Sequence, residues 1–114
     1  MTALNDLRDR LRDFARARDW EQFHSPKNIS MALIVEAAEL VEHFQWLTEQ
    51  QSYELPPEKL REIEEEIADI FIYLVRLSDR LNVDMLDAAW RKIDKNEKKY
   101  PADLVRGSAE RPKL

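Results

Sequence analysis

The stretch that decides the fold is LIVEAAEL, residues 33–40. It has the composition of a buried helix, but it contains the two carboxylates Glu36 and Glu39, three residues apart. Because a helix advances about 100° per residue, Glu36 falls within about 60° of Leu33 and Leu40, on the apolar face. Glu39 lies at the edge of that face. At least one of these glutamates is therefore not an ordinary surface residue.

The run EEEIADIFIYL, residues 64–74, repeats this pattern. Glu66 and Asp69 again lie three residues apart, and on a helix both Asp69 and apolar residues such as Ile70 fall within about 60° of Glu66. A second carboxylate pair therefore shares the helix face that should be buried.

The two pairs are also level with each other if the helices form an antiparallel hairpin. The midpoint of Glu36 and Asp69 falls at position 52.5, as does the midpoint of Glu39 and Glu66. That position lies within the expected connector, residues 50–57. The four carboxylates are therefore expected to converge between two helices.

Carboxylates crowded in a partly buried site repel one another unless a cation compensates their charge. Oxygen-only ligands suit Mg²⁺, Mn²⁺ or Ca²⁺, and Mg²⁺ commonly shares its coordination with substrate phosphates. Chance is one alternative, because the chain has 23 acidic residues. A di-iron carboxylate bundle is another, but it prefers Glu-x-x-His, and neither pair has a His at that offset.

The composition and charge of the chain limit its fold class and its possible partners. The chain has 114 residues, one Gly and no Cys, which favours a single all-α domain and fits a cytoplasmic protein. The net charge of −5 argues against binding long nucleic acid. No apolar run approaches about 18 residues and no signal-peptide pattern opens the chain, so we expect no membrane segment.

Periodicity predicts a helical bundle of about four helices. Pro56-Pro57 marks one helix start, Asp84 is suited to an N-cap, and Pro101 ends the last helix. The expected helices span residues 2–17, 29–49, 58–81 and 85–100, with an ordered loop at 19–28. Residues 1–100 then form the domain, and 101–114 form an extended tail.

The motif Glu36-x-x-Glu39, then 26 residues, then Glu66-x-x-Asp69 resembles the all-α nucleotide pyrophosphohydrolases, the MazG-like group. Further similarity to the dCTP pyrophosphatase branch covers nearly the whole chain. It comprises RDWEQFH (18–24), the PxNxxxAL spacing (26–33), FQW (44–46), DIFIYLV (69–75) and NEKKYPADLVRGS (96–108).

The resemblance implies Mg²⁺-dependent hydrolysis of a nucleoside triphosphate to the monophosphate and pyrophosphate, in nucleotide-pool cleansing. Mn²⁺ is a possible substitute metal. The four motif carboxylates would hold the metal, and Glu36 or Glu39 would activate the attacking water. The implied substrate is dCTP or a modified dCTP.

The helix at 85–100 carries a polar face suited to the triphosphate. Lys92, Lys95, Asn96 and Lys99 fall on one side at helical spacing. A solvated basic face is the alternative. The resemblance favours Lys92, Asn96 and Lys99 as phosphate-binding residues.

Trp20, Trp46 and Tyr73 are the candidates for stacking on the base, with His24 beside them, although aromatic residues more often belong to a core. His24 is expected to pack or hydrogen-bond and not to bind metal. Where the dCTP branch has a His on the first helix, this chain has Leu11, which leaves base preference open.

The resemblance also implies a homo-oligomer, either a dimer or a tetramer, in which a neighbour completes the pocket. Two rival functions stay open. One is the same chemistry on dUTP or another nucleotide. The other is a non-catalytic helical interaction module.

Overall fold

The computed structural model describes residues 2–109 and contains only helices within that range. It divides into two compact units, Met1–Asn82 and Val83–Leu114, which are described separately. The elements in chain order are α1 (Ala3–Ala17), η1 (Glu21–Phe23), α2 (Pro26–Glu42), η2 (Gln51–Tyr53), α3 (Pro57–Arg80), α4 (Met85–Lys99) and α5 (Ala102–Val105). The expectation of an all-α protein is confirmed.

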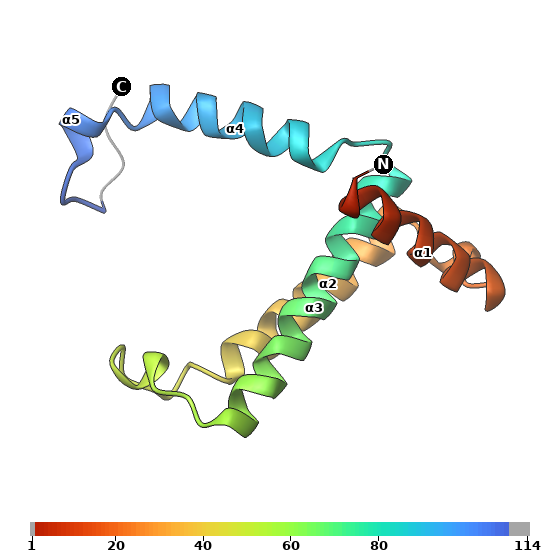
Figure 1. Ribbon diagram of the computed structural model, residues 1–114, viewed down its shortest axis with the longest axis horizontal. Coiled ribbons are helices and arrows are strands. Elements are labelled where there is room, and N and C mark those ends of the chain that lie inside the picture. Colours follow the sequence, from red (N-terminus) through yellow and green to blue (C-terminus); the bar gives the residue numbers. More distant parts are fainter. Residues whose placement is uncertain (1, 110–114) are drawn as a thin grey trace. The chain divides into compact units, whose positions relative to one another are not determined.

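In the first unit, α2 and α3 pack along one another as a helical hairpin, and α1 packs against α3 (Figure 1). The buried apolar residues of the described chain are few: Ala15, Ile29, Ile63 and Val75. They come from all three long helices of the unit, so this small core fixes α1 and the hairpin together.

The helix starts follow from local chemistry. The hydroxyl of Thr2 accepts a hydrogen bond from the Asn5 amide, and the Ser25 hydroxyl accepts one from Asn28, each at 3.1 Å. The Asp84 carboxylate accepts from the Asp87 amide at 3.0 Å, as its sequence position predicts. Such N-caps each stabilise a helix by about 1 kcal/mol.

The expected span of the second helix, 29–49, is wrong at both ends. Helix α2 begins at Pro26 and ends at Glu42, so Leu47 is not on its apolar face. At this end the hydrogen bonds tighten, because the Phe44 amide donates to the Val41 carbonyl three residues back, at 2.9 Å. Farther along the chain, the Thr48 hydroxyl accepts from the Gln51 amide at 3.1 Å, and the Gln51 side chain accepts from the Thr48 amide at 2.9 Å. This reciprocal capping starts a new turn at η2.

The second unit contains α4 and the short helix α5. The stretch 101–114 was expected to be extended, but residues 102–105 are helical because Pro101 starts a turn and its carbonyl accepts from Leu104 at 3.0 Å. Residues 110–114 of the expected tail lie outside the described chain. The boundary between domain and tail stays a prediction.

Candidate active site

Three of the four predicted metal ligands come together across the α2–α3 hairpin. Glu36 and Glu39 of α2 and Glu66 of α3 each offer one carboxylate oxygen, and the three oxygens lie within 4.8 Å of one another. We call these three residues the acidic cluster. The 3.6-residue repeat places Glu36 and Glu39 one turn apart on α2, and the packing of the hairpin brings Glu66 opposite them.

Two oxygens of the acidic cluster lack partners. Oε2 of Glu36 and Oε2 of Glu66 are both buried, and neither has a hydrogen-bond partner. Unpartnered buried carboxylate oxygens are costly, because desolvation is not offset by a donor or a cation. A hard divalent cation prefers oxygen ligands of this type, so the residues present fit a metal such as Mg²⁺.

The pKa of Glu36 reflects this crowding. It is raised from its ordinary 4.5 to about 7. The largest cause is sharing of a proton with the Glu66 carboxyl, followed by burial, proton sharing with Glu39, and the negative charges of Glu39 and Asp69. Without a cation, the site therefore holds its negative charge only at a free-energy cost.

Asp69 is exposed and lies outside the group of three, although it is near enough for its charge to raise the pKa of Glu36. The pKa of Tyr73 is also raised, first by burial and then by the charges of Glu36 and Asp69. Tyr73 is therefore near the acidic cluster, and its role in binding a base stays a prediction.

The other predicted base-pocket residues are spread over two segments. Trp46 lies between α2 and η2 and is 88% exposed. Trp20 packs edge-on against Phe14, with ring centroids 5.7 Å apart, and against His24 at 6.4 Å. Their role in binding a base stays a prediction.

His24 belongs to a different group of side chains. Its Nδ1 lies 3.3 Å from Arg76 Nη2, and its backbone carbonyl accepts from Arg80 Nε at 3.0 Å. Burial, then the charges of Arg76 and Arg80, lower the pKa of His24. The ring is therefore held by hydrogen bonding to an arginine, one of the two roles expected for it.

The predicted phosphate-binding residues lie on α4 in the second unit. Lys92 and Lys95 are exposed, and Asn96 and Lys99 are half-buried. The Asn96 carbonyl accepts from the Tyr100 amide at 2.7 Å, and the Lys99 ammonium lies 5.5 Å from the Tyr100 ring centroid. Their contact with phosphate stays a prediction.

One charged network between α1 and α3 is not predicted from the sequence. Arg12 of α1 forms a two-pronged ion pair with Asp79 of α3, and Arg76 lies 3.5 Å from the same carboxylate. Arg76 is only 4% exposed. The sequence contains one sign of this network: Arg76 and Asp79 carry opposite charges and lie three residues apart in the apolar end of α3.

The family model and the similar proteins agree on one family. A model of the MazG-like family matches residues 31–111. The chain is 45% identical to mouse (Mus musculus) and 43% identical to human (Homo sapiens) dCTP pyrophosphatase 1, over 93% of its own length. It spans 64% of the length of these curated relatives.

A solved structure agrees with the sequence matches. A pyrophosphatase from Archaeoglobus fulgidus DSM 4304 superposes with a TM-score of 0.84 at 40% identity, covering 89% of this chain and 94% of that one. The family match includes all three residues of the acidic cluster. The chain belongs to the MazG-like family.

Proposed function

We propose that the chain hydrolyses a deoxynucleoside triphosphate, dCTP or a modified dCTP, to the monophosphate and pyrophosphate with the help of Mg²⁺. The observation that carries this proposal is the acidic cluster: its three residues each bring one carboxylate oxygen within 4.8 Å of the others, and two of them, Glu36 and Glu66, also have a buried Oε2 without a partner. Relatives that bear the names dCTP pyrophosphatase and pyrophosphatase support the reaction class.

The metal would be held by Glu36, Glu39, Glu66 and Asp69, with Mn²⁺ as a possible substitute. When bound, Mg²⁺ would supply charge neutralisation and Lewis-acid polarisation at the phosphates. The exposed Asp69 carboxylate, next to the cluster, is free to complete the ligand set or to hold a metal-bound water. The metal-dependent part of the proposal is therefore tied to four named carboxylates.

The chain's own residues would position and deprotonate the attacking water. A carboxylate of Glu36 or Glu39 would accept its proton as the water oxygen bonds to the α-phosphorus. The bond from that phosphorus to the bridging oxygen breaks, and pyrophosphate leaves with the electron pair. The remaining predicted contacts are Lys92, Lys95, Asn96 and Lys99 to the phosphates, and Trp20, Trp46, Tyr73 and His24 to the base.

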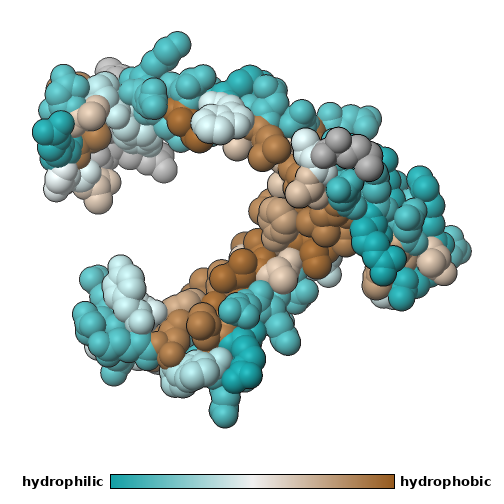
Figure 2. All heavy atoms as spheres, in the orientation of Figure 1, coloured by the Kyte–Doolittle hydropathy of each residue, from teal (hydrophilic) through white to brown (hydrophobic). Residues whose placement is uncertain are grey.

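We further propose that a second copy of the chain covers an exposed apolar surface on the hairpin. The surface consists of apolar side chains at helical spacing, each at least 37% exposed, and Figure 2 shows apolar colouring along this hairpin. The residues are Met31, Ile34 and Val35 of α2 and Ile67, Phe71 and Leu74 of α3. Because the described chain buries so few apolar residues, burial against a second copy would supply the missing core.

A nucleotide panel tests the activity. The chain is incubated with Mg²⁺ and each of several deoxynucleoside triphosphates, and pyrophosphate is measured separately from orthophosphate. Release of pyrophosphate, fastest with dCTP or a modified dCTP, is expected. A preference for dUTP would change the substrate but keep the chemistry, whereas no pyrophosphate from any nucleotide would favour the interaction module.

Sedimentation tests the assembly. The wild-type chain is expected to sediment as a dimer or tetramer, and Phe71→Asp in the exposed apolar surface to shift it toward monomer. Lys98→Asp, a change on a charged helix outside that surface, is the control. A stable wild-type monomer with full activity would rule out the proposed oligomer.

A cytoplasmic location stays a prediction. Among the described residues, no helix has the length and apolar character needed to span a membrane.

A further inference from the structure

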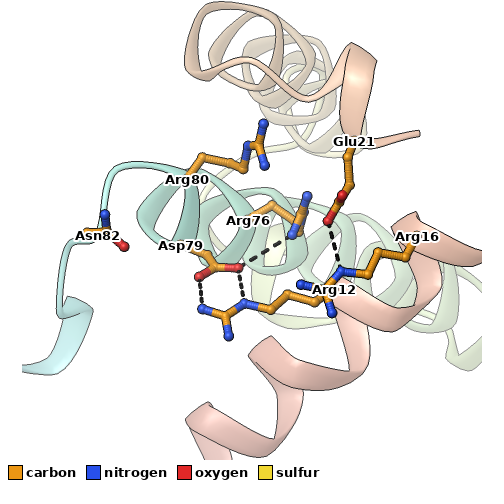
Figure 3. A pocket seen from close by; sticks show the side chains of 7 residues that line it. All are labelled: Arg12, Arg16, Glu21, Arg76, Asp79, Arg80 and Asn82. Carbon is orange, nitrogen blue, oxygen red and sulfur yellow. Dashed lines mark hydrogen bonds and ion pairs between the residues drawn. The ribbon is translucent and has the colours of Figure 1, made fainter. Parts of the chain in front are cut away.

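A second concentration of charge lies at the C-terminal end of α3, away from the acidic cluster. Side chains from α1, η1, the C-terminal end of α3 and the turn after it line an open pocket of about 320 Å³ (Figure 3). We call it the arginine pocket. Its lining residues are Arg12, Arg16, Glu21, Arg76, Asp79, Arg80 and Asn82.

The arginine pocket carries an excess of positive charge. Four guanidinium groups face two carboxylates, which leaves two positive charges without a formal counter-charge. Arg12 is paired with Asp79, and Arg16 Nε lies 3.3 Å from Glu21. The carboxylates are thus each already engaged by one arginine of α1.

The remaining two arginines have mainly neutral partners. Arg76 shares Asp79 at 3.5 Å and otherwise meets the ring of His24 at 3.3 Å. Arg80 donates to the His24 carbonyl at 3.0 Å, and no residue in the described chain forms an ion pair with it. The uncompensated charge is therefore located on Arg76 and Arg80.

Arg76 also has an unfilled hydrogen-bonding site. The side chain is 95% buried, yet its Nε has no acceptor. Burial of a guanidinium without full compensation is costly, and burial lowers the pKa of Arg76. An oxyanion in the pocket would supply the negative charge that the protein leaves out beside Arg76 and Arg80.

We propose that the arginine pocket binds a phosphate group, either free phosphate or the phosphate of a nucleoside monophosphate. A phosphate near neutral pH carries close to two negative charges and several acceptor oxygens, which matches the excess charge and the forked donors of arginine. No residue of the proposed active site lines this pocket. The two sites meet only through His24, which contacts Arg76 and Arg80. Arg76 follows Asp69 by seven residues, about 10 Å along the helix axis, so the pocket is a separate site.

Calorimetry on the full chain tests the proposal without using activity. Inorganic phosphate is titrated in the presence of EDTA at constant ionic strength, so that no divalent cation can hold phosphate at the acidic cluster. One saturable site per chain is expected. In a second arm the ligand is dCMP: tighter binding of dCMP identifies a nucleotide as the source of the phosphate, and equal or weaker binding identifies free phosphate.

Two pocket variants and a matched control locate the site. Arg80→Gln removes an exposed guanidinium and should preserve the fold, and its Kd for phosphate is expected to rise about tenfold. Arg76→Gln should weaken binding at least as much. The control is Arg91→Gln, which makes the same charge change on α4, outside the pocket, and should bind as the wild type does.

Three outcomes would overturn the proposal. The first is the absence of saturable phosphate binding by the wild-type chain. The second is an Arg80→Gln variant that binds as tightly as the wild type. The third is equal weakening by Arg91→Gln, which would show that net charge and not the pocket attracts phosphate. Circular dichroism of each variant checks the fold, and Arg80→Gln decides if Arg76→Gln does not fold.

Discussion

Glu36 and Glu66 lie on different helices, yet each brings a carboxylate oxygen within 4.8 Å of the other, and each also has a buried Oε2 without a hydrogen-bond partner. Helix packing has therefore forced like charges together. Without a cation, this arrangement opposes the packing of α2 against α3. The same arrangement favours binding of a divalent cation, so activity and stability should both respond to changes in this cluster.

Loss of one cluster carboxylate should stop turnover and leave the fold intact. Glu39→Gln keeps the size of the side chain but removes its charge, and we expect kcat/KM to fall roughly 100-fold or more because metal binding or proton transfer is lost. Initial rates of pyrophosphate release, with circular dichroism, measure both properties. The control is Glu42→Gln, an exposed glutamate at the end of the same helix. Unaltered activity of Glu39→Gln would remove the site assignment.

The metal-free chain should lose stability as pH rises. The pKa of Glu36 is about 7 in the folded chain and near 4.5 when unfolded, so between these values the folded state binds more protons than the unfolded state. The free energy of unfolding therefore falls as pH increases through this window and levels off above it. Urea denaturation in EDTA at several pH values measures the slope.

The comparison variant for this pH effect is Glu36→Gln, which cannot titrate. His24 acts in the opposite direction, because its lowered pKa adds stability as pH rises. The slope of the wild type should therefore be more negative than that of Glu36→Gln, and Mg²⁺ should reduce the difference. Identical slopes in EDTA would show that Glu36 does not retain its proton in the fold.

The ion pair between α1 and α3 should be important for stability. Asp79 is held by Arg12, whose hydrogen bond keeps the pKa of that carboxylate below its usual range. Asp79→Asn leaves Arg76 buried without its carboxylate, and we expect a loss of about 3 kcal/mol in the free energy of unfolding. Urea denaturation near neutral pH measures the loss. Asp9→Asn, which removes a half-exposed partner of Arg12, should cost less than about 1 kcal/mol.

Trp46 should affect substrate binding far more than stability. Its side chain is 88% exposed, so truncation removes little packing. If the indole stacks on the base, Trp46→Ala should raise KM about tenfold or more with little change in the melting temperature. Tyr53→Ala is a matched control, because Tyr53 is an aromatic residue with 86% exposure in the same connector. An unchanged KM for Trp46→Ala would exclude this residue from the base pocket.

The sequence predicted the hairpin and its carboxylates because both depend on local periodicity. Glu36, Glu39 and Glu66 repeat with the helix period on apolar faces, and the connector length fixes which residues lie level across the hairpin. Asp69 is exposed and lies outside the cluster of three, so its part in holding the metal stays a prediction. A helix period gives the direction of a side chain only within about 60°, which does not fix how far its carboxylate lies from the others.

Other features depend on contacts that periodicity does not encode. The turn that leads into η2 depends on side-chain hydrogen bonds between Thr48 and Gln51. The arginine pocket depends on residues such as Arg12 and Asp79, which are 67 positions apart in the chain and meet only through packing. Sequence patterns therefore predict the helices, whereas the contacts of each charged side chain can be read only from the structure.

The few buried apolar residues of the described chain have a practical consequence. If copies associate through the exposed apolar surface, folding and association are linked by mass action, and the melting temperature rises with protein concentration. Dilution would then lower the fraction of the chain that is folded. Substitutions far from any substrate, on the outward side of the hairpin, would change how much active protein a cell retains.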